Sequence, residues 1–192
     1  MIDIIGKSKI KQNILKLLFS NQEKEFYLSE IARIAGASRG NAQKELKKLE
    51  KVGIIKSEKR NNLRYYFLNK QNSLFAEWEG IVKKTIGIEN ELKNIIQEIS
   101  RIEHAFIFGS YARGDFKSES DIDLFIIGNP EENELIRQIT KLEKEINREI
   151  NYHIYSEKEF KKKIKINSFL QNVVKKYIML TDNEKEFRKM LR

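Results

Sequence analysis

The sequence contains no cysteine, a single proline and two histidines among its 192 residues. Without cysteine the chain forms no disulfide bonds and no thiolate metal sites, which agrees with a reducing compartment. It also lacks any run of 18 apolar residues, so we expect no membrane span. The N-terminus shows neither a secretory nor a transit pattern. We therefore expect a cytoplasmic globular protein without a membrane partner.

Charge is spread unevenly along the chain. Residues 1–73 contain 16 lysine and arginine residues against 7 acidic ones, a net charge of +9, whereas residues 74–192 contain 21 of each. Clustered cations are what neutralisation of nucleic-acid phosphates requires. The pattern favours a basic module that binds double-stranded DNA, joined to a neutral module with another task.

The basic segment shows helical spacing followed by strand alternation. Apolar residues from Lys9 predict a helix that ends near Ser20, and a short helix should follow with Ser29 as its N-cap and Gly36 just past its end. A longer helix is expected over 38–51, joined to the short one by the glycine-containing turn. Residues 54–68 then read as a β-hairpin with a cationic tip.

This order resembles the winged helix-turn-helix domains of bacterial and archaeal transcription regulators. The resemblance places the start of the second helix in the major groove and the hairpin tip on phosphate or in the minor groove. A dimerisation or protein-docking module is the alternative interpretation. The DNA-contacting candidates are Ser38, Arg39, Asn41, Gln43 and Lys44 on the helix and Lys59 and Arg60 on the hairpin.

Residues 74–103 form the connector. They lack the composition of a flexible linker, and a helix is predicted from Ile88 to Ile102. Trp78, Ile81 and Val82 either pack in the core or contact a second subunit, and a homodimer is expected on that second interpretation. The junction resembles that of proteins in which a winged helix is fused to a nucleotidyltransferase domain.

The chemistry is concentrated in residues 108–124. Gly109 and Ser110 follow the apolar strand 104–108, where a glycine lets phosphate approach the backbone and a hydroxyl and N–H groups can donate to it. Asp121 and Asp123 stand two apart at the start of a second strand, so both carboxylates point to one face. Such a pair suits Mg²⁺ or Mn²⁺. Arg113 either binds a phosphate or pairs with Asp115 or Glu119.

Gly-Ser, ten residues, then Asp-x-Asp resembles the signature of the polymerase-beta-like nucleotidyltransferases, most of all their minimal branch. The resemblance implies transfer of a nucleoside monophosphate from a nucleoside triphosphate to a hydroxyl, with metal ions held by carboxylates. The expected fold class is α+β: a winged helix-turn-helix domain over 1–73, a helical connector over 74–103, and a nucleotidyltransferase α/β domain over 104–192 with a mixed sheet and flanking helices.

The resemblance to this family also implies a third carboxylate on a later strand. Here a helix is predicted over 131–147 and a strand over 149–155, which puts Asn151 at the third position. Asparagine offers a neutral oxygen and cannot act as a general base. His153, in phase with Asn151, either takes that role or is structural, and Glu149 is the other in-phase candidate.

The last segment is expected to be helical. Ser156 and Glu159 have the spacing of a capping box, and Phe169, Val173, Tyr177 and Leu180 recur at the spacing of one helical face. The lysine-rich stretch 161–165 either forms a solvated helix face or attracts a nucleic acid or a triphosphate.

Two functions follow from these patterns. One is a DNA-binding nucleotidyltransferase that modifies a protein hydroxyl or an RNA end; because small relatives often act as antitoxins, a partner toxin belongs to this hypothesis. The other is a transcription regulator whose impaired domain senses a nucleotide, which Asn151 favours. A purely structural fusion would leave Gly109, Ser110 and the two aspartates unexplained.

Overall fold

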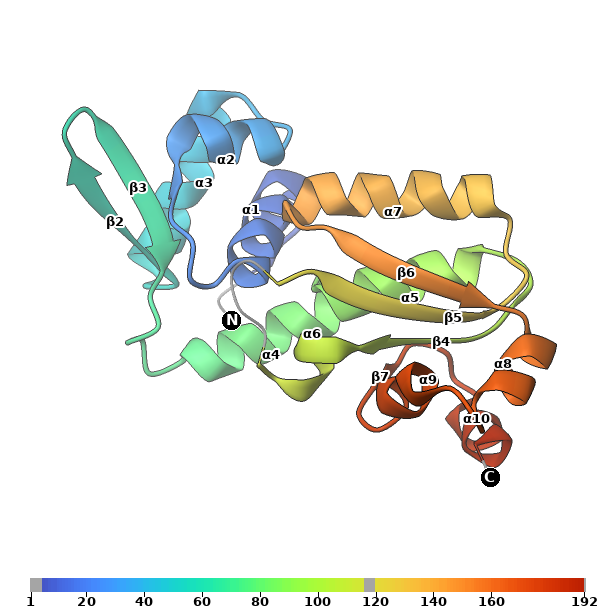
Figure 1. The fold of residues 1–192 in the computed structure, drawn as a ribbon. Helices are drawn as coiled ribbons and strands as arrows, with labels where there is room; N and C mark the ends of the chain where they lie inside the picture. Colours follow the sequence, from blue (N-terminus) through green and yellow to red (C-terminus); the bar gives the residue numbers. More distant parts are fainter. Residues whose placement is uncertain (1–4, 116–119, 192) are drawn as a thin grey trace. The chain divides into compact units, whose positions relative to one another are not determined.

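The computed structural model describes residues 5–115 and 120–191, which form two compact units (Figure 1). The first unit runs to Asn90 and includes Lys144–Asn147, and the second comprises Glu91–Glu143 and the chain from Arg148 onward. No helix in the described ranges is both long and apolar enough to span a bilayer.

Four helices build most of the first unit: α1 (Lys9–Ser20), α2 (Leu28–Ile34), α3 (Arg39–Lys51) and α4 (Phe75–Thr85). The Oγ of Ser38 accepts a hydrogen bond from the Asn41 backbone N–H, which caps α3. Gly36, with φ +64°, ends α2 as predicted. The prediction for Ser29 was wrong, because α2 begins at Leu28 and its N-cap is Tyr27, without a side-chain cap bond.

A three-stranded antiparallel sheet completes this unit, with β1 (Phe26–Tyr27), β2 (Ile55–Arg60) and β3 (Leu63–Leu68) in the order β1-β3-β2. The predicted hairpin is therefore present, and its turn residue Asn61 has φ +52°. Apolar side chains of the helices and the sheet share one core, which also contains Trp78 and Val82 of α4. Core packing was thus the correct interpretation for these two residues, whereas Ile81 is exposed.

The second unit is built on a mixed sheet, as predicted. Its strands are β4 (Ile102–Phe108), β5 (Ile122–Gly128), β6 (Ile150–Tyr155) and β7 (Ile178–Met179), in the order β6-β5-β4-β7. Only the β5–β6 pair is parallel. Nearly every side chain of β4 and β5 is buried, which indicates that both faces of the sheet are covered.

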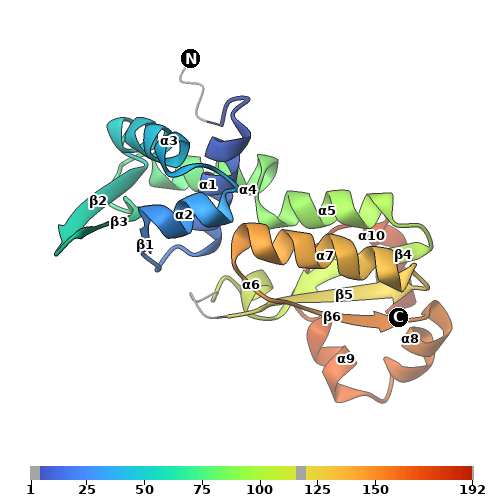
Figure 2. The ribbon, with the colours of Figure 1, turned by 90° about the horizontal axis from the view of Figure 1, so that it is seen from above.

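Helices cover both faces of this sheet. Phe106, Phe108, Phe125 and Ile127 alternate along their strands and pack on one face against α8 (Glu157–Lys163), α9 (Ser168–Val173) and α10 (Glu184–Met190). The opposite face is covered by α5 (Ile88–Glu98) and α7 (Glu132–Ile146) (Figure 2). The short helix α6 (Gly109–Arg113) follows β4 directly.

Two predictions for this unit were wrong. Helix α5 ends at Glu98, and Ile102 begins β4 instead of closing a helix. The single helical face expected to extend to Leu180 does not form, because α9 stops at Val173 and Ile178–Met179 pair with β4. The capping box at the start of α8 is present: Ser156 accepts from the Glu159 backbone, and the Glu159 carboxylate accepts from the Ser156 backbone.

Candidate active site at the strand ends

Gly109 lies where β4 turns into α6, and two features of this position require glycine. Its φ of +70° is one that side-chain-bearing residues rarely adopt. A Cβ atom built on it would lie 2.0 Å from Oδ2 of Asp123. The absence of a side chain therefore lets the carboxylate of Asp123 lie against the backbone at the start of α6.

Strand register brings the other polar residues to the same place. Asp123 is opposite Phe108 across the antiparallel β4–β5 pair and beside Asn151 across the parallel β5–β6 pair. Asn151 Nδ2 donates a hydrogen bond to Oδ2 of Asp121, with the two atoms 3.0 Å apart. The structure thus gathers Gly109, both aspartates and Asn151 around the ends of three neighbouring strands.

The two carboxylates form an acidic site with little internal compensation. Partial burial raises the pKa of Asp123, and the nearby charge of Asp121 raises it further, whereas His153 and Arg113 act in the opposite direction. A divalent cation would relieve this repulsion, and carboxylate oxygens are the ligands that Mg²⁺ prefers. Within the described ranges no group of three or more acidic, histidine or cysteine residues gathers. Among the described residues, Asp121 and Asp123 could hold a metal ion, and Asn151 could add its amide oxygen.

Ser110 and Arg113 extend the site along α6. Ser110 is the second residue of the helix, and its carbonyl oxygen accepts from the Asp115 backbone N–H. The Nε atom of Arg113 lies 3.4 Å from Oδ2 of Asp115, so one predicted ion pair is present, and both side chains are exposed. Glu119, the other predicted partner, lies outside the described residues. Beside Gly109 and Arg113 the surface is hollowed into a cavity of about 430 Å³.

Comparison with known proteins identifies the family of this part of the chain. Residues 89–178 match the model of the nucleotidyltransferase domain. A candidate protein adenylyltransferase of Methanocaldococcus jannaschii is 45% identical over 74 residues, which is 38% of this chain and 73% of the relative. The chain belongs to the nucleotidyltransferase family. It is a nucleotidyltransferase, and enzymes of this family use a nucleoside triphosphate and a divalent metal ion.

Solved structures give a more distant likeness. One is a toxin–antitoxin structure with AMP-PNP, 17% identical, with a TM-score of 0.41, covering 54% of this chain and 81% of that one. Another is a DNA-binding protein of Sulfolobus solfataricus, 23% identical, with a TM-score of 0.32, covering 45% of this chain and 88% of that one.

In this nucleotidyltransferase, His153 and Glu149, which each lie two residues from Asn151, have different environments. His153 lies two residues after Asn151 on the same face of β6. Its ring centroid is 5.0 Å from that of Phe169, and its charge acts on Asp123. The Glu149 carbonyl accepts from the Ile122 backbone N–H, and its side chain is exposed. Of these two residues, His153 is the one whose charge acts on Asp123.

Arg148 is a site residue that the sequence interpretation missed. It is buried, with 8% of its surface exposed, and its guanidinium donates to the carbonyl of Ser120, directly before Asp121. Burial lowers the pKa of Arg148, whereas the charges of Asp121 and Tyr111 act to raise it. Arg148 therefore holds the backbone that carries Asp121. The sequence signal is weak: an arginine immediately before the predicted strand that carries Asn151.

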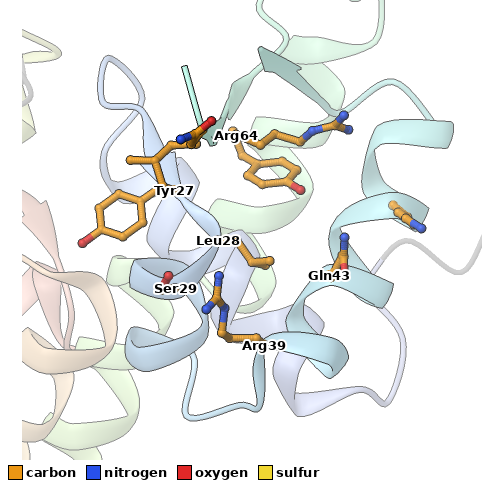
Figure 3. A pocket seen from close by; sticks show the side chains of 10 residues that line it. Tyr27, Leu28, Ser29, Arg39, Gln43 and Arg64 are labelled. Atoms are coloured by element: carbon orange, nitrogen blue, oxygen red, sulfur yellow. The ribbon is translucent and has the colours of Figure 1, made fainter. Parts of the chain in front are cut away.

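The first unit contains the residues predicted to contact DNA. Arg39, Asn41, Gln43 and Lys44 are exposed on α3, and Ser38 is its N-cap. A cavity of about 400 Å³ lies between α3 and β3, and Figure 3 shows Arg39 and Gln43 beside it on α3 and Arg64 on β3. Its lining, which also includes Lys47, contains no acidic residue within the described ranges.

The two predicted hairpin residues differ. Lys59 is exposed on β2. Arg60 forms ion pairs with Glu25 and Glu58, and its guanidinium carbon lies 5.4 Å from the ring centroid of Tyr65. The guanidinium of Arg60 therefore already has two carboxylate partners.

Proposed function

We propose that the protein transfers the adenylyl group of ATP to a hydroxyl group of a protein. The observation that carries this proposal is the convergence of Gly109, Asp121 and Asp123 at the strand ends. The identity with a candidate protein adenylyltransferase supports the choice of nucleotide and acceptor. Nucleic-acid hydroxyls are the other acceptor class.

In the proposed reaction the acceptor oxygen forms a bond to the α-phosphorus of ATP. The bond from that phosphorus to the oxygen bridging the β-phosphate breaks, and pyrophosphate leaves with that oxygen. Asp121 and Asp123 would hold Mg²⁺ or Mn²⁺, which neutralises charge developing on the phosphates. Ser110 and Arg113 of α6 would donate to phosphate oxygens beside Gly109.

The acceptor proton needs a base, and Asn151 cannot serve. We propose His153 for this step, because it follows Asn151 in phase on β6 and carries an imidazole nitrogen that can accept a proton. His153→Ala should lower kcat by about a hundredfold at neutral pH and remove the corresponding limb of the pH–rate profile. A uniform loss at all pH values would indicate a structural role.

The test of adenylyl transfer is mass spectrometry of candidate acceptor proteins after incubation with ATP and Mg²⁺. We expect a mass increase equal to one AMP group, lost when Asp121 and Asp123 are both changed to asparagine. A partner toxin and proteins captured from the native host are the acceptors to try first. Transfer that survives the double substitution would contradict this site.

Asn151 supports a second candidate function, a regulator that binds a nucleotide without turnover. Its amide adds no negative charge and donates to Asp121. This function predicts ATP binding by calorimetry without pyrophosphate release, together with an ATP-dependent change in DNA affinity. Equal DNA affinity with and without ATP would argue against it.

We further propose that the first unit is a winged helix-turn-helix domain that binds double-stranded DNA and that the protein is a homodimer. Its net charge and the cavity between α3 and β3, whose described lining contains no acidic residue, support DNA binding. Sedimentation should give the mass of two chains if the protein is a homodimer. Duplex binding measured by fluorescence anisotropy should weaken steeply as the salt concentration rises. Salt-independent binding would contradict a phosphate-contacting surface.

A further inference from the structure

The cavity beside Gly109 has a lining that suits a polyphosphate. Arg113, Lys175 and Lys176 line it, and it contains no acidic side chain within the described ranges. Asp115 compensates only Arg113. Three cations next to the glycine that adjoins Asp123 are complementary in charge to the triphosphate of a nucleotide.

Hydrogen bonds place the two lysines at this cavity. Lys176 Nζ donates to the carbonyl of Arg113 at 3.0 Å, which ties the segment after α9 to the end of α6. Lys175 Nζ donates to Oδ1 of Asn172 at 2.8 Å, within the same lining. Neither lysine has a carboxylate partner among the described residues, so an anionic ligand would not have to displace an ion pair.

Another part of the lining is aromatic. Phe169 of α9 is 39% exposed although its neighbours Leu170 and Val173 are buried. Its ring meets Phe108 and His153 in T-shaped contacts, at centroid distances of 6.0 and 5.0 Å. No parallel partner lies on the ring among the described residues. An exposed ring beside cations is the arrangement in which a nucleobase stacks.

We propose that this cavity holds the base and the outer phosphates of the bound nucleotide. Phe169 is the stacking surface for the base, and Lys175 and Lys176 bind the β- and γ-phosphates. The volume of about 430 Å³ falls within the range of small-molecule sites, roughly 300–1,000 Å³. This inference rests on the proposed function, because it takes ATP as the substrate. It assigns the nucleotide to the α9 side.

Isothermal titration calorimetry of the full chain with Mg²⁺ separates the two parts of the assignment, using ATP and inorganic tripolyphosphate as ligands. Phe169→Ala should weaken ATP binding about tenfold and leave tripolyphosphate binding unchanged, since stacking involves only the base. Lys175→Ala combined with Lys176→Ala should weaken both ligands by about tenfold or more. Phe169→Trp should retain ATP affinity.

Two substitutions outside the cavity serve as matched controls. Ile166→Ala removes another exposed apolar side chain, and Lys185→Ala another exposed cation, and neither should change either affinity. Thermal melting checks that every variant folds. An equal effect of Phe169→Ala on both ligands, or unchanged ATP affinity in the lysine variant, would overturn the assignment.

If the acceptor protein occupied this cavity in place of ATP, the variants would behave differently. In that case the same variants would bind ATP normally and raise KM for the acceptor protein, which also overturns the inference. A failure of the proposed function is distinguishable: if no acceptor is modified yet ATP binding depends on Phe169 and the two lysines, the nucleotide site stands and only the transfer is refuted.

Discussion

The two units use charge in different ways. In the first unit, Arg39, Lys47 and Arg64 stand on a helix and a strand and line a cavity without requiring unusual backbone geometry. In the second unit, strand register and a glycine with positive φ bring Asp121 and Asp123 beside Gly109 and Asn151. Each single substitution on the cationic surface of the first unit should therefore weaken binding only in part. In the second unit, by contrast, one substitution at Gly109 should be enough to disrupt the site.

The largest effect should come from Gly109→Ala. The new Cβ would collide with Oδ2 of Asp123, and displacing a reacting group by about 1 Å can cost a hundredfold in rate. Gly114→Ala is the matched control, because its φ of +84° is equally unfavourable but no atom lies within 4 Å of the new Cβ. Adenylyl transfer should fall about a hundredfold in the first variant and stay within a few-fold in the second. Similar losses in both would show that backbone strain, and not the position of Asp123, limits the rate.

An intermediate effect is expected on DNA binding. Arg39→Ala should weaken duplex binding by about tenfold and reduce the salt slope by about 1, since Arg39 has no ion-pair partner among the described residues. Arg60→Ala should change affinity by less than about threefold, because Glu25 and Glu58 already hold its guanidinium. Fluorescence anisotropy at several salt concentrations measures both. A larger loss for Arg60 than for Arg39 would reverse the proposed roles of hairpin and helix.

The smallest effect concerns stability. Because the pKa of Asp123 is raised in the folded protein, its contribution to stability is present below the ordinary aspartate pKa of about 3.9 and is lost as pH rises through the raised value. Asp123→Asn should thus raise the melting temperature by about 2 °C at neutral pH without metal, and the difference should vanish below about pH 4.

The effect of Mg²⁺ on the melting temperature is a second test of this stability prediction. Mg²⁺ should stabilise the wild type and leave Asp123→Asn unchanged, because the variant lacks one of the two proposed ligands. Asp182→Asn, a change at an exposed carboxylate paired with Lys93, should not raise the melting temperature. A melting temperature of Asp123→Asn below that of the wild type at neutral pH would contradict the proposed repulsion.

Local patterns predicted the parts of the fold that local interactions determine. The helix spacing over α3, the hairpin, and the pattern of Gly109 followed by Asp121 and Asp123 are each encoded within one short stretch of the sequence. The capping box before α8 is another example, because its two partners are three residues apart.

Features that depend on distant partners were not predictable from these patterns. Ile178–Met179 form a strand because β4, about 70 residues earlier in the chain, presents an edge to them. Arg148 becomes a site residue only when it is buried beside Ser120. The cationic cavity combines α6 with residues near α9 that are more than fifty positions apart, so its lysines looked like ordinary surface charges.

The most direct test of the central claim compares ATP labelled at the α-phosphorus with ATP labelled at the γ-phosphorus. If Asp121 and Asp123 form a nucleotidyltransferase centre, the acceptor gains the α label and not the γ label, and Asp123→Asn reduces incorporation by at least about a hundredfold. Transfer of the γ label, or α-label transfer that Asp123→Asn leaves intact, would contradict the account.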